Sequence, residues 1–303
     1  KANYIPTIDL KDPKFKEYFY DYLTLFLFWY YYFEKHSVKA IISSHPVYSY
    51  VLPLRVAASK KILAYVLDIE HLFKVTKKNL YQLSDCKDFK KISKSLNKFD
   101  LKKGKIEAKK RLEHRFTGAE AINIDYPDLQ KSSFHKKFNK RVIKETKRKK
   151  ILICAHEFFD APHIYGRNFF SDFHEWMEYL GKLSKTTNYD WYIKTHRNQP
   201  GKYKIYQPLT HNILNDFVKK YKNIKLLPNN YSHQQILKEK VDFVLTVYGS
   251  IAYEYPLFNI PVINATKNHP QRMYNFSITP KSKKHYGNML KNLENLNYKI
   301  NKS

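Results

Sequence analysis

Residues 241–264, VDFVLTVYGSIAYEYPLFNIPVIN, predict a strand, a tight turn, a helix and a second strand. Val241–Val247 is a mainly apolar run of the length of a buried strand, with Asp242 and Thr246 as its polar residues, and Pro261–Asn264 is a shorter run. Between them, Gly249-Ser250 predicts the turn and residues 251–259 the helix. Two strands joined by a helix in this way lie parallel in one sheet. The stretch is therefore one βαβ unit of a parallel α/β fold.

The same alternation of strand and helix extends back along the chain to residue 151, with one strand about every 20–25 residues. Apolar runs predict three further buried strands, at Ile151–Ala155, Asp190–Lys194 and Ile224–Leu227. Apolar residues at helical spacing predict intervening helices, at about residues 171–185, at about 209–221 and directly after Ser232. This order is typical of a doubly wound parallel sheet with helices on both faces.

A second βαβ unit is predicted near the N-terminus, where Val38–Ser43 and Ile62–Leu67 flank a helical stretch at residues 47–60. A length of 303 residues suits two domains. We therefore expect an α/β fold of two Rossmann-like domains that face each other across a cleft. The expected parts are residues 1–145, residues 146–303 and, at their junction, a basic connector over about residues 74–150.

The chain carries 55 Lys and Arg residues against 27 Asp and Glu, a formal net charge of +28. Such a surface attracts polyanions, whether nucleic acid, an anionic membrane leaflet, an acidic glycan or a nucleotide. The chain is also rich in Tyr, Phe, Asn and Ile, which share AT-rich codons with Lys, so a genome-wide bias is an alternative source of the charge. The seven glycines form neither G-x-G-x-x-G nor a P-loop, which excludes the ordinary dinucleotide and P-loop fingerprints.

The most apolar stretch is Tyr18–Phe33, YFYDYLTLFLFWYYYF. Its 16 residues fall short of the roughly 20 that span a bilayer, and it contains Asp21. It predicts a buried helix, with a helix lying in the membrane interface as the alternative because Trp29 and the tyrosines suit that boundary. Two cysteines build no disulfide framework, which favours a reducing compartment. We expect a cytoplasmic location, with peripheral contact at the inner membrane face.

Polar groups follow three of the predicted strands at their carboxyl ends, where open α/β sheets bind ligands. The first helical N–H groups after Gly249-Ser250 would bind a phosphate, with the Ser250 hydroxyl beside them and Glu254 reaching a ribose. An ordinary helix cap and a surface carboxylate are the alternative. The other expected donor-binding residues on this edge, each of which could equally be a solvated loop side chain, are Lys194, His196, Arg197, Ser232 and Tyr248.

The loop after the strand at Ile151–Ala155 holds the densest set of proton-transfer groups, His156, Glu157, Asp160 and His163. H-E-x-x-x-D-x-x-H contains possible metal ligands, but it lacks the H-E-x-x-H spacing, and we expect no metal. A structural loop whose polar groups bond to backbone is the alternative to a catalytic one. His45, in the corresponding loop of the N-terminal unit, would face the cleft from the other side, or else only open a helix.

Three segments resemble the C-terminal half of bacterial capsule and surface-polysaccharide biosynthesis glycosyltransferases: ILICAHEFFDAPHIYGRNFFSDFHEWMEYL, IKTHRNQP and LTVYGSIAYEYPLFNIPVINA. These enzymes are similar to Kdo- and sialyl-type transferases that use CMP-activated sugars. The resemblance covers residues 151–275 well and 38–67 weakly. It implies a GT-B-like fold with an acceptor-side N-terminal domain, a nucleotide-sugar-binding C-terminal domain and no metal or other cofactor. The family's His-Pro dipeptide is interrupted here, at His196 to Pro200, and no D-x-D triplet occurs.

The resemblance implies transfer of a sugar from a nucleotide-activated donor, with CMP-Kdo as the favoured kind, to a surface glycan or glycolipid acceptor. Asp160 or Glu157, and after them His156, would act as the base, while His163, Tyr165 and His45 would shape the acceptor pocket. Expected partners are the nucleotide sugar, the acceptor and an anionic membrane surface, but no nucleic acid. The alternatives are a nucleotide-sugar epimerase of the same fold, a basic nucleic-acid-binding protein and a catalytically silent membrane scaffold.

Overall fold

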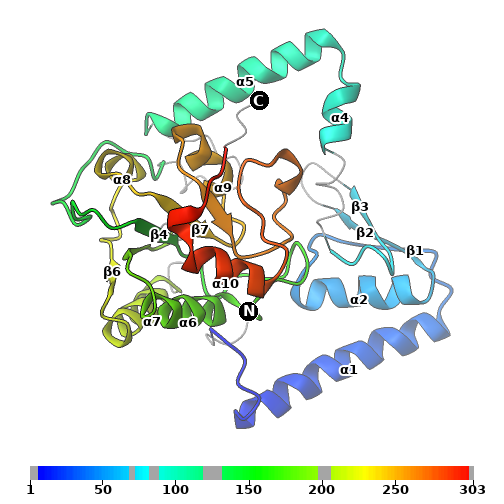
Figure 1. Cartoon of the computed structure of the whole chain (residues 1–303). Helices are drawn as coiled ribbons and strands as arrows, with labels where there is room; N and C mark the ends of the chain where they lie inside the picture. The colour runs from blue at the N-terminus through cyan, green and yellow to red at the C-terminus, as the bar shows by residue number, and fades with distance from the viewer. Residues whose placement is uncertain (1–5, 68–71, 82–88, 119–131, 197–205, 300–303) are drawn as a thin grey trace.

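A computed structural model describes residues 6–67, 72–81, 89–118, 132–196 and 206–299 of the chain. Its larger sheet has five parallel strands in the order β6-β5-β4-β7-β8 (Figure 1). The strands are β4 (Lys150–Cys154), β5 (Asp190–Lys194), β6 (Ile224–Leu226), β7 (Phe243–Thr246) and β8 (Val262–Asn264). The predicted parallel α/β sheet of the C-terminal half is confirmed. Its chain runs from β4 outward to β6 and then returns to the other side of β4.

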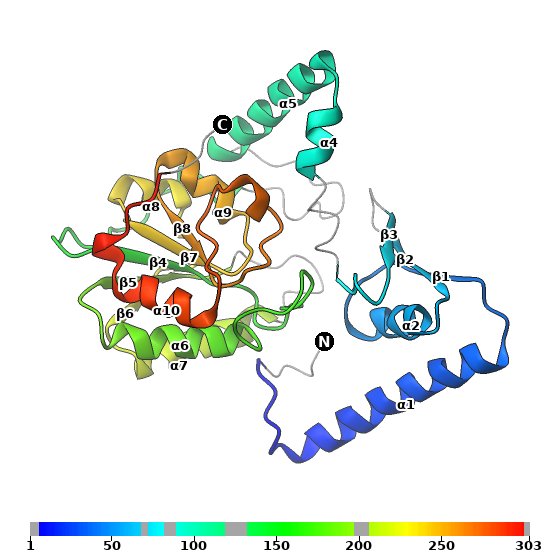
Figure 2. The ribbon, with the colours of Figure 1, turned by 45° about the vertical axis from the view of Figure 1, so that its right-hand side comes forward.

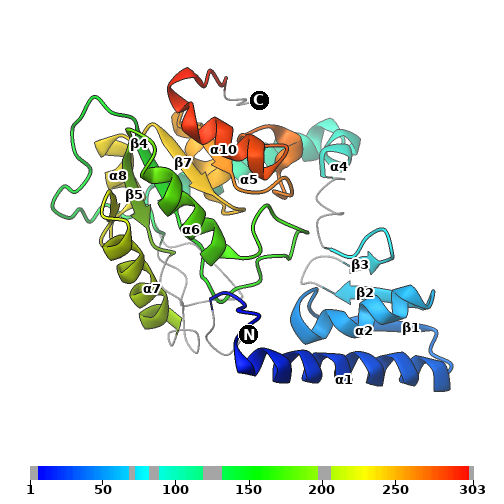
Figure 3. The same ribbon diagram turned by 60° about the horizontal axis from the view of Figure 1, so that its bottom comes forward.

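Helices cover both faces of this sheet, because alternate strand residues point to opposite sides. Ile151 and Ile153 pack with α6 (Phe173–Ser184), α7 (Tyr206–Lys220) and α10 (Lys283–Lys291) in one buried cluster. Leu152 and Cys154 pack with α8 (His233–Glu239), α9 (Ile251–Glu254) and the 3-10 helix η3 (Tyr255–Phe258) in another. Figure 3 shows α6 and α7 side by side on the first face. Two further 3-10 turns are η4 (Arg272–Tyr274) and η5 (Leu293–Asn295).

The smaller sheet has three strands in the order β1-β2-β3, at Ala40–Ser43, Leu63–Leu67 and Leu72–Val75. β1 and β2 are parallel and joined by α2 (Tyr48–Ser59), as the sequence predicts. β3, which was not predicted, is antiparallel to β2. The expected Rossmann-like character of the N-terminal part is therefore corrected to a single βαβ unit with an added antiparallel strand. Figure 2 shows this sheet set apart from the larger one.

The apolar stretch at Tyr18–Phe33 lies within α1 (Pro13–Lys35), which begins after the capping carboxylate of Asp12. One side of α1 packs on α2 through Leu25, Trp29 and Phe33, but only Phe33 is buried. The expectation of a buried helix is wrong for the rest of α1, because no described residue of the small N-terminal unit buries its outer face. Within the described part of the chain, no helix combines the length and apolarity needed to cross a bilayer.

The sequence of the basic connector predicts helical stretches near residues 87–116, and the structure has two exposed helices there, α4 (Phe89–Ser95) and α5 (Lys98–Phe116). The sequence also predicts an irregular segment around Asp125–Pro127, which lies outside the described residues. Farther along, Phe134 and Ile143 are fully buried in the α8 and α9 side of the larger sheet. The end of the connector therefore packs with the C-terminal part, while the domain boundary near residue 145 stays a prediction.

Replacing Gly181 with alanine is expected to destabilise the larger sheet's helical layer by about 1–3 kcal/mol. A Cβ atom at Gly181 would lie 2.4 Å from Cε2 of Tyr221. That ring is buried and its hydroxyl donates to Glu178 Oε2 at 2.9 Å, so it cannot move aside easily. Urea unfolding measures the effect. The control is Gly104→Ala in α5, where a Cβ meets nothing within 4 Å and should stabilise the helix by about 0.5–1 kcal/mol. Equal stabilities of the two variants would contradict this packing.

Candidate functional site

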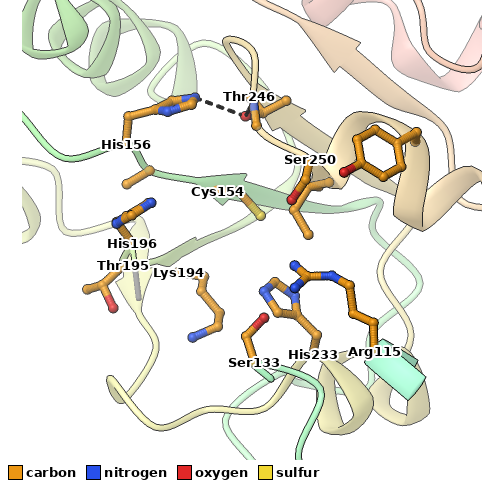
Figure 4. Close-up of a pocket in the computed structure, with 14 residues that line it drawn as sticks. Arg115, Ser133, Cys154, His156, Lys194, Thr195, His196, His233, Thr246 and Ser250 are labelled. Atoms are coloured by element: carbon orange, nitrogen blue, oxygen red, sulfur yellow. Dashed lines mark hydrogen bonds between the residues drawn. The ribbon is translucent and has the colours of Figure 1, made fainter. Parts of the chain in front are cut away.

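A cavity of about 390 Å³ opens at the carboxyl edge of the larger sheet. Its walls come from the ends of β4, β5 and β7, with additions from α5, α8 and α9 (Figure 4). The chain leaves β4 toward β5 but leaves β7 toward β8 on the opposite side. Loops after neighbouring strands that diverge in this way leave a crevice, which is the usual ligand site of doubly wound folds. The fold itself therefore places the cavity.

Lys194, the last residue of β5, provides one cation of the cavity. It lies opposite Cys154 of β4, its side chain is 5% exposed, and its Nζ donates to the Asn229 carbonyl oxygen at 3.2 Å. Burial lowers the pKa of Lys194 to about 8, because the charged ammonium loses hydration. An anion in the cavity would restore the favourable environment of that charge.

Arg115, at the end of α5, provides the second cation. Its Nε donates to Glu254 Oε1 in α9, and its guanidinium lies 5.6 Å from the centre of the Phe134 ring. Glu254 is fully buried and is not among the residues that line the cavity. The expected ribose-binding role of Glu254 is therefore corrected, because its carboxylate is committed to orienting Arg115. Figure 4 shows the Arg115 side chain directed into the cavity beside His233.

The turn after β7 is held by His156 and Thr246. Thr246 Oγ1 accepts from the Gly249 N–H at 3.2 Å, and His156 Nε2 lies 3.1 Å from Thr246 Oγ1 (Figure 4). His156 Nε2 also accepts from the Val247 N–H at 3.2 Å. Burial lowers the pKa of His156 to about 3, so the ring is neutral with its acceptor nitrogen occupied. These bonds give His156 a positioning part in the turn, and its part as the third candidate base stays a prediction.

Gly249 and Ser250 line the cavity as the sequence predicts, but the helix after them is shorter than expected. α9 has four residues and continues as the 3-10 helix η3, in place of a helix over residues 251–259. Pro256, within η3, removes a backbone donor and interrupts the α-helical pattern. A four-residue helix aligns few peptide dipoles. The positive charge of the cavity therefore comes from Lys194 and Arg115 rather than from a helix N-terminus.

Ser232, which was expected to bind the donor, does not line the cavity, whereas its neighbour His233 does. Ser232 is fully buried as the N-cap of α8, where its hydroxyl accepts from the Gln234 N–H and donates to the His135 carbonyl oxygen. His233 Nδ1 lies 2.8 Å from the Tyr255 hydroxyl, and burial holds the pKa of His233 well below its usual range. His196 lines the cavity as predicted, whereas Arg197 lies outside the described residues.

Of the candidate bases in the loop after β4, His156 lines the cavity, whereas Glu157 and Asp160 do not. Glu157 is buried, it accepts from the Thr210 hydroxyl, and burial raises its pKa. Asp160 is exposed, and its Oδ1 accepts from the Ala161 N–H at 2.8 Å. Both carboxylates thus accept hydrogen bonds from within the protein, as in the alternative in which the loop after β4 is structural and not catalytic. A catalytic part for either carboxylate stays a prediction.

The expected acceptor-pocket residues also lie away from the cavity walls. Tyr165 packs edge-on against Tyr248, with ring centres 5.3 Å apart, and the Tyr248 hydroxyl donates to the Ala161 carbonyl oxygen at 2.6 Å. Tyr248, expected to bind the donor, instead anchors the loop after β4. His163 is exposed on that loop, and His45 is exposed on the smaller sheet, after β1.

Sequence reasoning missed several cavity residues: Arg115, Ser133, Cys154, Thr195, His233, Thr246 and Tyr253. Cys154, Thr195 and Thr246 lie at the ends of correctly predicted strands, so the rule that already selected Lys194 could have found them. Arg115 and Ser133 belong to the basic connector, and no local pattern marks them. Contacts of the end of α5 with segments far along the chain, such as the pair of Arg115 with Glu254 in α9, bring Arg115 to the cavity.

The described residues that line the cavity combine two cations with several hydroxyls and three histidines, and include no Asp or Glu. Such a lining suits a small ligand that carries negative charge and hydroxyl groups. Within the described ranges, no three His, Cys, Asp or Glu side chains gather closely enough to hold a metal ion. Fold and site together define a doubly wound α/β protein with a cavity lined by two cations at the point where the strand order reverses.

No protein-family model matches the sequence, and no curated protein matches it either. Among solved structures, the chain is similar to an S. aureus MnaA–UDP co-structure, with 19% sequence identity and a TM-score of 0.33. The match covers 49% of this chain and 38% of that chain, so it spans well under half of that structure. At this level of similarity, the function of the chain has to come from its own site.

Proposed function

We propose that the cavity binds the phosphate-bearing part of a nucleotide-activated sugar, and that the protein transfers the sugar to a glycan or glycolipid acceptor. One observation carries the proposal: Lys194 and Arg115 converge at the strand-order reversal in a cavity with no carboxylate among its described lining residues. A sugar nucleotide offers phosphate charge for the cations and sugar hydroxyls for Ser133, Thr195 and Ser250. The resemblance to surface-polysaccharide transferases supports the same class of substrate.

In the proposed reaction, an acceptor hydroxyl attacks the anomeric carbon of the donor while the bond to the phosphate oxygen breaks. Negative charge grows on the departing nucleotide phosphate, and Lys194 and Arg115 stabilise it as preorganised donors. The proton of the acceptor hydroxyl passes to a base. Asp160 is the base we propose, because it is exposed on the loop after β4, the strand whose end borders the cavity.

Nucleotide binding tests the donor site directly. We expect one of CMP, CDP, UDP, GDP or ADP to bind at least about tenfold more tightly than its nucleoside, because only the phosphate meets the two cations. Calorimetry of each nucleotide beside its nucleoside measures the ratio, and a thermal shift at saturation provides a second readout. If no nucleotide binds, or each binds no better than its nucleoside, the proposed donor site is wrong.

Product analysis separates transfer from the alternative, epimerisation. With a donor labelled in the sugar and a lipid-linked or polysaccharide acceptor, transfer moves the label into the acceptor and releases unlabelled nucleotide. Asp160→Asn should abolish this movement while nucleotide affinity changes less than about twofold, because Asp160 does not line the cavity. Label that stays in a nucleotide sugar of altered configuration would overturn transfer in favour of epimerisation.

A further inference from the structure

The α4–α5 segment, residues 89–116, is strongly basic. It holds eleven Lys and Arg residues against three Asp and Glu, a surplus of eight positive charges in 28 residues. Arg111 and Lys109 are paired with exposed glutamates of α5 itself, and Arg115 with Glu254. The other lysines extend into solvent, since α5 has no buried residue. This charge is therefore available to a partner.

The same segment exposes large apolar side chains, which a purely electrostatic surface would not need. Phe99 is 75% exposed and Ile106 is 61% exposed, and in α4 and its junction Ile92 and Leu96 are about half exposed. Phe99 and Ile106 are seven residues apart, so they share one face of α5. Three lysines flank them on that face within 60° of helical rotation, at positions 102, 103 and 110.

The contacts between α5 and the larger sheet that involve described residues lie at the C-terminal end of the helix. There Phe116 packs edge-on against Phe134 and Phe258, and Arg115 pairs with Glu254. Figure 2 shows the rest of α5, and α4 after the bend, projecting away from that sheet. The face of Phe99 and Ile106 thus belongs to a protruding arm whose fixed end lines the cavity.

We propose that the α4–α5 arm binds the surface of an anionic lipid bilayer. Its lysines would contact negatively charged headgroups while Phe99 and Ile106 enter the boundary with the acyl chains. A nucleic-acid duplex would use the charge, but its stacked bases and phosphate backbone offer Phe99 and Ile106 no apolar surface to enter, whereas a bilayer uses both. Because Arg115 ends the arm inside the cavity, this contact would hold the cavity near the membrane surface. The proposal stands on the arm alone and is independent of the ligand of the cavity.

Vesicle co-sedimentation of the full chain tests the arm without any nucleotide. Vesicles of phosphatidylcholine alone are compared with vesicles that contain one third phosphatidylglycerol, at low and high salt. We expect binding to the anionic vesicles at low salt, and its loss at high salt and on neutral vesicles. The triple variant K102Q/K103Q/K110Q should weaken binding by at least about tenfold. Phe99→Ser with Ile106→Ser should weaken it by about five- to tenfold at unchanged charge.

The matched control is K281Q/K284Q/K291Q, which removes three exposed lysines on and beside α10. It should bind anionic vesicles within twofold of the unmodified chain, and all variants should keep the same urea midpoint. Equal loss in the control would overturn the proposal, because total charge and not the arm would then cause binding. An arm that binds a DNA duplex but not anionic vesicles, with no effect of the Phe99 and Ile106 changes, would overturn it in favour of nucleic acid.

Discussion

Replacing Lys194 with methionine is expected to weaken nucleotide binding by about 10- to 100-fold while leaving the protein folded. The loss arises because Lys194 places an ammonium in the cavity wall at the end of β5. The fold should tolerate the change, because a side chain that is 5% exposed and carries an unfavourably desolvated charge is replaced by an apolar one of similar length. Calorimetry with the tightest nucleotide of the panel measures the ratio of dissociation constants.

The lowered pKa of Lys194, about 8, adds a pH dependence to this prediction. Below that pH the ammonium is charged and attracts phosphate, and above it the neutral amine does not. Nucleotide affinity should therefore fall as the pH rises from 7 to about 9.5, a range in which the phosphate itself is already ionised. The Lys194→Met variant should show a flat profile over the same range.

Lys182→Met is the control, since Lys182 is exposed on α6 and does not line the cavity. It should bind nucleotide like the unmodified chain and keep the pH dependence. A Lys194→Met variant that binds with unchanged affinity, or that retains the decline above pH 8, would show that Lys194 does not contact the phosphate.

The second large effect is on stability: Arg115→Ala should lower the free energy of unfolding by about 3–5 kcal/mol. Glu254 is fully buried, and its Oε1 accepts from Arg115 Nε. Its Oε2 has no hydrogen-bond partner among the described residues, so loss of Arg115 leaves a buried carboxylate without its cation. The double variant Arg115→Ala with Glu254→Gln should recover a large part of the loss. Urea unfolding of the single and double variants measures the coupling.

Arg111→Ala provides the matched control one turn earlier in α5. Arg111 pairs with Glu107 at 3.1 Å, and both side chains are exposed, so its removal should cost less than about 0.5 kcal/mol. If Arg115→Ala is no more destabilising than Arg111→Ala, the pair with Glu254 does not anchor α5. Arg115 both anchors α5 through Glu254 and provides a cation at the cavity. Nucleotide binding by the two single variants separates these effects, because Glu254→Gln keeps the cation and Arg115→Ala removes it.

The strands of the larger sheet were predictable because their signals are local. Ile151–Ala155 is apolar throughout and Val241–Val247 is mainly apolar, which is typical of strands buried on both faces. Parallel strands joined by helices bring their carboxyl ends to one edge, so Lys194, His196, Gly249 and Ser250 were expected together, and all four line the cavity. The N-terminal β3 was missed because its alternating pattern is only four residues long.

The residues for which the sequence misled are those whose partners lie far along the chain. Glu254 lies one helical turn after Gly249-Ser250, where the sequence suggests ligand binding. Its carboxylate instead accepts a hydrogen bond from Arg115, which lies 139 residues earlier in the chain. Ser232 and Tyr248 lie where ligands bind, but their hydroxyls bond to the backbone of His135 and Ala161. No local pattern records which of several polar groups in a loop will be satisfied within the protein.

By itself, the sequence determined the parallel α/β character, the edge of the larger sheet at which a ligand site forms, and the excess of positive charge. Hydrophobic runs and net charge are properties of neighbouring residues and of composition, so they can be read without contacts. Only the tertiary structure decided that Arg115 joins Lys194 at the cavity, that Glu254 is buried against it, and that the carboxylates of the loop after β4 lie outside. These outcomes depend on packing between segments far apart in the chain, where burial forces each polar group to find a partner.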